Sequence, residues 1–132
     1  MKTKPSPGRQ GFTLVEIMIV VAIIALLASI AVPGFLRARK RSQASRIIND
    51  LRLIDNAVDM YAIEYNKSTG NLVNVSDWTK YMKTGTNLYV TGKDILGNLY
   101  GPQSVDAIPK VTTAAYNALS DVAADPFWSP YH

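Results

Sequence analysis

The chain has 132 residues, enough for one compact domain, and it contains no cysteine, which excludes disulfides, thiol catalysis and thiolate metal sites. Much of its formal net charge of +4 comes from two short stretches, the N-terminus and residues 37–41. No nucleic-acid-binding motif accompanies these charges, so we do not expect nucleic acid as a partner.

The first predicted element is an apolar segment behind a basic leader. Residues 17–36 carry no charge and are mostly Ile, Val, Ala and Leu, and Lys2, Lys4 and Arg9 precede them. At about 1.5 Å per residue, a helix of this length spans the ~30 Å hydrocarbon core of a bilayer. A signal peptide cleaved near residues 29–31 and a plain membrane anchor would both share this pattern.

A carboxylate at the start of this segment argues for a third interpretation. Glu16 inside a membrane segment costs several kcal/mol unless it is paired or protonated. If the chain is cut between Gly11 and Phe12, the new amine of Phe12 lies on the same helix face as Glu16, four residues on. The two groups would neutralise each other, within one chain or between staggered neighbours. As a hypothesis, this buried ion pair sets the register of a filament.

The sequence Gly11-Phe12-Thr13-Leu14-Val15-Glu16 resembles the processing motif of type IV pilins and type II secretion pseudopilins. The resemblance implies that a prepilin peptidase cuts after Gly11 and methylates the amine of Phe12. It also implies that Glu16 guides each subunit into the growing fibre.

Pro33 falls where this family usually has a helix-perturbing proline, and Gly34 follows it. Proline removes a backbone hydrogen bond and glycine lowers helix propensity, so we expect a bend or a locally melted stretch there.

Four basic residues, Arg37, Arg39, Lys40 and Arg41, follow the apolar segment, and we expect them at lipid headgroups. A simple count of basic residues would place the C-terminal part in the cytoplasm, whereas the resemblance places it in the periplasm.

An amphipathic helix is predicted next. Apolar residues recur at spacings of three and four, which predicts a face packed on a small sheet, a free coiled-coil dimer being the alternative. They are Ala44, Ile47, Leu51, Ile54, Val58, Tyr61 and Tyr65. Together with the apolar segment they predict one long helix over about 12–66, ended by the turn formers of residues 66–70.

The last third predicts short elements only. Residues 76–82 indicate a short helix, residues 88–91 and 97–101 a hairpin, residues 111–113 a third strand and residues 113–122 another helix. The aromatic residues of 127–131 are expected to cap the sheet or to contact the next subunit.

Neither a cofactor nor catalysis is expected. Residues 94–100 loosely resemble a loop of major pseudopilins, which often bind calcium nearby, so calcium is the alternative. The aspartates Asp94, Asp106, Asp121 and Asp125 lack EF-hand spacing. The single histidine is the terminal His132, and the chain has no glycine-rich phosphate loop and no zinc-ligand cluster.

The sequence therefore predicts an α+β, pilin-like fold, with a long N-terminal helix packed on a small antiparallel sheet. Residues 1–11 would be a cleaved leader, 12–36 a transmembrane and filament-core helix, 37–66 an amphipathic helix and 67–132 a small globular α/β region.

The resemblance implies a structural filament subunit. The short chain and the absence of cysteine favour a type II secretion pseudopilus, and a type IV pilus for adhesion, motility or DNA uptake is the alternative. Implied partners are identical and related subunits in a helical polymer, the prepilin peptidase, an inner-membrane assembly platform and, before assembly, membrane lipid. The implied location is the bacterial inner membrane, with the C-terminal domain in the periplasm, and then a periplasmic or cell-surface filament.

Overall fold

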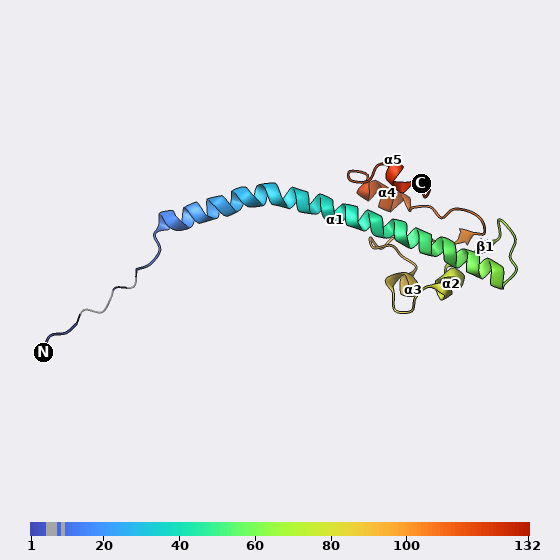
Figure 1. The fold of residues 1–132 in the computed structure, drawn as a ribbon, viewed down its shortest axis with the longest axis horizontal. Helices are drawn as coiled ribbons and strands as arrows, with labels where there is room; N and C mark the ends of the chain where they lie inside the picture. The colour runs from blue at the N-terminus through green and yellow to red at the C-terminus, as the bar shows by residue number, and fades with distance from the viewer. Residues whose placement is uncertain (5–7, 9) are drawn as a thin grey trace. The chain divides into compact units, whose positions relative to one another are not determined.

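A computed structural model describes residues 1–4, 8 and 10–132, so Arg9 of the basic leader lies outside the described residues. The chain divides into two compact units, residues 1–36 and 37–132. Figure 1 shows the elements in chain order. They are α1 (Leu14–Glu64), β1 (Leu72–Val73), α2 (Val75–Trp78), the 3-10 helix η1 (Thr79–Tyr81), α3 (Asn87–Thr91), β2 (Gln103–Ser104), α4 (Thr113–Leu119) and α5 (Asp125–Trp128).

The predicted long helix is confirmed as α1, which starts and ends within two residues of the expected limits. Helix continues through Pro33 and Gly34, so neither residue melts it in this structure. Because proline has no N–H, the carbonyl of Ser29 still loses its donor four residues ahead. Local melting of this stretch within an assembled filament stays a prediction.

The C-terminal end of α1 is closed by backbone hydrogen bonds. Asn66 takes a left-handed conformation (φ 48°), and the amide of Lys67 donates to the carbonyl of Ala62 at 2.8 Å. A bond of this reach over a left-handed residue is the Schellman arrangement, which satisfies a carbonyl that the helix leaves open. The turn formers after residue 65 thus end the helix as predicted.

The stripe predicted along α1 is a core face, as expected. Ala44, Ile47, Leu51, Ile54 and Val58 are each 3% exposed or less, and together with the small residues Ala57 and Ala62 they line the core. Tyr61 is half-buried against this core. The prediction is wrong for Tyr65, whose side chain is 53% exposed and whose ring lies tilted against the Tyr61 ring at a centroid distance of 4.7 Å.

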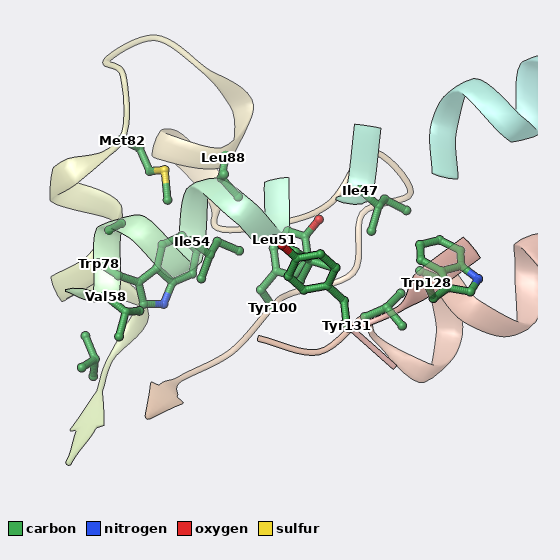
Figure 2. Packing of buried hydrophobic residues seen from close by; sticks show 14 of the residues in the cluster. Ile47, Leu51, Ile54, Val58, Trp78, Met82, Leu88, Tyr100, Trp128 and Tyr131 are labelled. Carbon is green, nitrogen blue, oxygen red and sulfur yellow. The ribbon is translucent and has the colours of Figure 1, made fainter. Parts of the chain in front are cut away.

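Short elements of residues 72–131 cover this face of α1. In the view of Figure 1, α2 and α3 lie along one side of the C-terminal half of α1, and α4 and α5 lie along the other. Each contributes a buried side chain: Trp78 from α2, Leu88 from α3, Leu119 from α4 and Trp128 from α5. Figure 2 shows Leu51, Tyr100 and Tyr131 gathered at the middle of this cluster.

The fold is α+β, but the antiparallel sheet among the described residues is smaller than predicted. Leu72 pairs with Ser104 and Val73 pairs with Gln103, which gives two strands of two residues each. Sequence reasoning predicted neither strand. A two-residue pair has too short a pattern to show alternation.

The predicted strand at residues 88–91 is wrong, because this segment is part of α3. The hydroxyl of Thr86 accepts from the amide of Tyr89 at 3.2 Å, which caps the helix. At the other end, Gly92 takes a left-handed conformation (φ 62°) and its amide donates to the carbonyl of Leu88 at 2.9 Å. These two caps override the strand propensity of the β-branched and aromatic residues between them.

The other two predicted strands are also absent from the described chain. Residues 97–101 make only an isolated bridge, between Lys93 and Leu99, because the side chain of Asp94 organises this loop. Residues 111–113 enter α4 instead, where the hydroxyl of Thr112 accepts from the amide of Ala115 at 3.3 Å. Both predicted short helices, at 76–82 and 113–122, are confirmed as α2 with η1 and as α4.

The aromatic C-terminal segment packs into the core. Trp128 is fully buried and its indole N–H donates to the carbonyl of Ala123 at 3.1 Å. Tyr131 is 8% exposed, and its carbonyl accepts from the amide of Val111 at 2.7 Å. Trp128 and Tyr131 therefore pack into the core of their own chain, and contact of this segment with another subunit stays a prediction.

Candidate processing and assembly site

The peptide bond between Gly11 and Phe12 is exposed. Both residues precede α1 and lie outside regular secondary structure, and Phe12 is 86% exposed. Gly11 has no left-handed φ, and a Cβ added to it would meet nothing within 4 Å. Since neither the backbone conformation nor crowding requires glycine here, the fold gives no reason for this residue. A requirement for glycine would have to come from another molecule that binds the chain at this residue.

Directly after this bond, α1 begins with a capping box. The amide of Thr13 donates to Glu16 Oε2 at 2.9 Å, and the amide of Glu16 donates to Thr13 Oγ1 at 3.2 Å. This reciprocal arrangement satisfies two amides that a helix start leaves without partners. The carboxylate in the first turn also interacts favourably with the positive end of the helix dipole. Sequence reasoning missed this motif, although the spacing Thr-x-x-Glu is its signal.

The capping box fixes the direction in which Glu16 points. Its carboxylate turns back toward the N-terminus of α1 and is bonded to Thr13, the residue that follows Phe12. A cut after Gly11 would create an amine on the residue adjacent to that bonded amide. The pairing of this amine with Glu16 stays a prediction, because the uncut chain has no amine at Phe12.

The first part of α1 is exposed on all sides. Large apolar side chains between Leu14 and Leu36 are 48–77% exposed, and the most apolar window of the helix has no buried residue. Within the described residues, α1 is the one helix that is long and apolar enough to cross a membrane. Exposed apolar area of this extent marks a surface that another apolar phase or molecule covers.

The four aspartates considered for calcium do not come together. Asp106 accepts from the hydroxyl of Thr69, Asp121 pairs with Lys40, and Asp125 contacts Tyr116 and His132. Among the described residues, no group of three or more His, Cys, Asp or Glu side chains could hold a metal ion. These four aspartates therefore form no common site among the described residues, and calcium binding stays an alternative prediction.

Asp94, the fourth of these aspartates, is a structural centre of its loop. It is 1% exposed, and it accepts from the amides of Leu96 at 2.8 Å and Asn98 at 2.9 Å. The side-chain amide of Asn98 donates to it at 3.0 Å, and the hydroxyl of Thr112 donates at 3.4 Å. Charge-assisted bonds to backbone amides compensate the burial of a carboxylate. The loop of residues 94–100 is therefore held by this side chain.

Comparison with known proteins gives a family match at the N-terminus. Residues 6–32 match the family model of the prokaryotic N-terminal methylation motif. This segment includes Gly11, Phe12 and Glu16 and extends over most of the exposed apolar helix. No solved structure matches the chain.

The similar proteins are components of secretion systems and pili. The chain is 34% identical over 59 residues to the type II secretion system core protein G of Aeromonas hydrophila, covering 45% of this chain and 41% of that protein. It is 38% identical over 56 residues to the protein of the same name in Escherichia coli K12, covering 42% and 39%. It is 42% identical over 62 residues to the type IV wide pilus major component PilA4 of Thermus thermophilus, covering 47% of each.

In each of these alignments the chain spans less than half the length of the curated relative. The chain therefore carries an N-terminal methylation motif and has homologues among type II secretion system core proteins G and type IV pilins.

Proposed function

We propose that this chain is a structural subunit of a type IV pilus-like filament, in the first place a type II secretion pseudopilus. It is made as a membrane precursor, cut after Gly11 and methylated on Phe12 by a prepilin peptidase. One observation carries the proposal: the methylation motif of residues 6–32 covers an exposed peptide bond that is followed at once by an apolar helix with no buried face. The role is structural and not catalytic.

The exposed apolar helix supports assembly into a filament. A helix that is apolar all round is stable only where it is covered on every side. Lipid covers residues 14–36 in the precursor, and the equivalent helices of identical and related subunits cover them in the filament. The assembly platform of the inner membrane would move the subunit from the first environment to the second, with the folded C-terminal unit in the periplasm.

The pair formed by Glu16 and the amine of Phe12 would set the position of each new subunit. An unpaired carboxylate among apolar helices is costly. Neighbouring subunits avoid this cost at the one axial offset that brings the carboxylate and the amine into contact. The capping box supports this role, because it already turns the carboxylate toward the end of α1 at which the amine would form.

A subunit of a type IV pilus is the second candidate. The similarity to the type IV wide pilus major component PilA4 of Thermus thermophilus favours it. Deletion of the gene separates the two. Loss of protein secretion with pili retained supports the pseudopilus, and loss of surface pili with secretion retained supports the pilus.

Processing is tested with matched glycine variants of the leader. Gly11→Val should leave the precursor uncut in the membrane when the chain is expressed with a prepilin peptidase. Gly8→Val is the control, because Gly8 is also exposed, with nothing within 4 Å of an added Cβ. Cutting of the Gly11→Val chain at the normal rate would contradict the proposal.

Assembly is tested at Glu16. Glu16→Ala should be cut normally but should give far fewer filaments in sheared or pelleted fractions. Glu16→Gln, which keeps the shape and removes the charge, should behave like Glu16→Ala. Normal filaments from both variants would count against the pairing.

A further inference from the structure

The four basic residues after the apolar segment do not share one environment. Arg37 and Arg41 lie one helical turn apart on the same face of α1. With Ala38 between them, they line an open hollow of about 510 Å³ whose opposite wall is Asp121 and Val122, from the segment after α4. All five residues belong to the second compact unit, and Arg39 is not part of the wall.

The one carboxylate in this wall is already engaged. Lys40 Nζ lies 2.8 Å from Asp121 Oδ2, with the two side chains 42% and 54% exposed. The hydrogen bond from Lys40 lowers the pKa of Asp121, and the positive charge of Arg37 contributes in the same direction. Asp121 is therefore ionised at neutral pH and matched by Lys40. Within the described part of the chain, no carboxylate lies within 4.0 Å of the guanidinium of Arg37 or Arg41.

We propose that Arg37 and Arg41 bind the headgroup phosphate of an anionic phospholipid in this hollow. This inference rests on the proposed membrane precursor. Two guanidinium groups offer planar, paired donors that match the oxygens of a phosphate, and they lose water more readily than an ammonium group.

Two features favour a lipid over a free phosphate as the occupant. Arg37 directly follows Leu36, the last residue of the apolar segment, so its position in the chain is next to the headgroup region when that segment is in the bilayer. The wall also contains Ala38 and Val122, whose apolar side chains can contact the glycerol end of a lipid. Basic residues beside a membrane segment attract anionic headgroups in any case. The hollow adds a defined place for one of them.

The binding test uses the full, uncut chain in a neutral detergent and counts bound lipids by native mass spectrometry. The probes are phosphatidylglycerol, phosphatidylcholine and inorganic phosphate. The double variant Arg37→Gln with Arg41→Gln should lower phosphatidylglycerol affinity on the order of tenfold. The control is Arg39→Gln with Arg52→Gln, which removes two charges from the same helix away from the hollow. It should lower affinity less than the first double variant does, by about fivefold or less, because only Arg39 lies beside the apolar segment.

A gain of affinity provides the second arm. Asp121→Asn removes the negative charge from the wall and releases Lys40, so phosphatidylglycerol should bind severalfold more tightly. Near-ultraviolet circular dichroism of the buried Trp78 and Trp128 checks that each variant is folded. An affinity gain in Asp121→Asn together with a selective loss in the Arg37 and Arg41 variant would support the proposal.

Three results would overturn it. Equal losses in the two double variants would show diffuse charge attraction and no site. Equal affinity for phosphatidylcholine and phosphatidylglycerol would show that binding does not depend on the headgroup charge. Inorganic phosphate that binds as tightly as the lipid would assign the hollow to free phosphate. The assay needs neither cleavage nor filaments, so its failure is separate from a failure of the proposed function.

Discussion

The two halves of α1 belong to one helix but meet different surroundings. Residues 14–36 have no buried side chain, and their apolar residues point in every direction. After the basic residues of 37–41, burial is confined to one stripe between Ala44 and Ala62, and polar side chains occupy most of the remaining surface. The second half therefore has one face that its own chain covers, whereas the first half has none.

This difference shows how one helix can be prepared for two kinds of partner. An amphipathic helix has one apolar face, and the rest of the chain packs on that face to form the core. A helix that is apolar all round specifies no side, so it suits lipid and a bundle of like helices equally. The change between the two patterns falls at Arg37, where the chain also divides into two compact units.

The largest expected effect comes from truncating one leucine in each half of α1. Leu51 is fully buried, so Leu51→Ala should lower the free energy of unfolding by about 2–5 kcal/mol. Leu27 is 61% exposed, so Leu27→Ala should change it by less than about 0.5 kcal/mol. Urea unfolding of the full chain in neutral detergent, followed by tryptophan fluorescence, measures both. Equal costs would mean that the first half also has a partner within its own chain.

A second test concerns the buried charge of the globular unit. Asp94→Ala leaves the amides of Leu96 and Asn98 without an acceptor and should cost about 1–3 kcal/mol of stability. The control Asp59→Ala removes an exposed carboxylate from α1 and should change stability by less than about 0.5 kcal/mol. The same urea titration measures the two variants. If Asp94→Ala leaves the free energy of unfolding unchanged, the loop is held by its backbone alone.

Sequence reasoning succeeded where a pattern is long. The stripe along α1 repeats over several turns, so it predicted the helix and five of its buried residues, and the apolar run predicted the exposed half. It failed at residues 88–91, because two caps, a threonine and a glycine, decide a single helical turn against the propensity of the residues between them. It also missed β1 and β2, which are too short to carry a pattern.

The candidate site was predictable in part. Gly11, Phe12 and Glu16 stand out from the residues around them, and the methylation motif covers all three. The spacing of Thr13 and Glu16 is the signal of the capping box, but the position of Glu16 in an apolar segment points first to a charge in lipid. The hollow beside Arg37 and Arg41 was not predictable, because Asp121 reaches it from a segment about 80 residues further along the chain.

A smaller effect is expected at the start of the exposed half. Thr13→Ala removes the hydroxyl that accepts from the amide of Glu16, so it should weaken the first turn of α1 by about 1 kcal/mol. Hydrogen exchange of the amides of residues 14–17 in detergent measures this local loss. Thr13→Ser keeps the hydroxyl and should protect these amides nearly as well as the native residue. Unchanged exchange in Thr13→Ala would show that the cap does not hold the helix start.

The smallest expected effect is a pH dependence of stability that comes from Asp50, in the covered half of α1. Burial raises the pKa of Asp50 above its usual 3.8, and the hydrogen bond from Tyr100 and the charge of Arg46 offset part of the shift. The folded chain therefore holds this proton to higher pH than the unfolded chain does. The resulting stability is complete below 3.8 and is lost as pH rises through the folded pKa.

Asp50→Asn should remove this loss, so the native chain should lose more stability than the variant as pH rises above 3.8. Asp121, with its lowered pKa, acts in the opposite direction, since its contribution is lost as pH falls. It is present in both chains and cancels in the comparison. Parallel stability curves for the two chains would show that burial of the Asp50 carboxyl group does not make stability depend on pH.

In the proposed function, the exposed half of α1 acquires a charged partner for Glu16 when the leader is removed. Intact-mass and N-terminal sequence analysis of the chain, recovered from cell envelopes that contain a prepilin peptidase, tests it most directly. We expect the recovered chain to start at Phe12 and to carry one extra methyl group on its amine. A mature chain that starts at any other residue, or that keeps its leader, would contradict it.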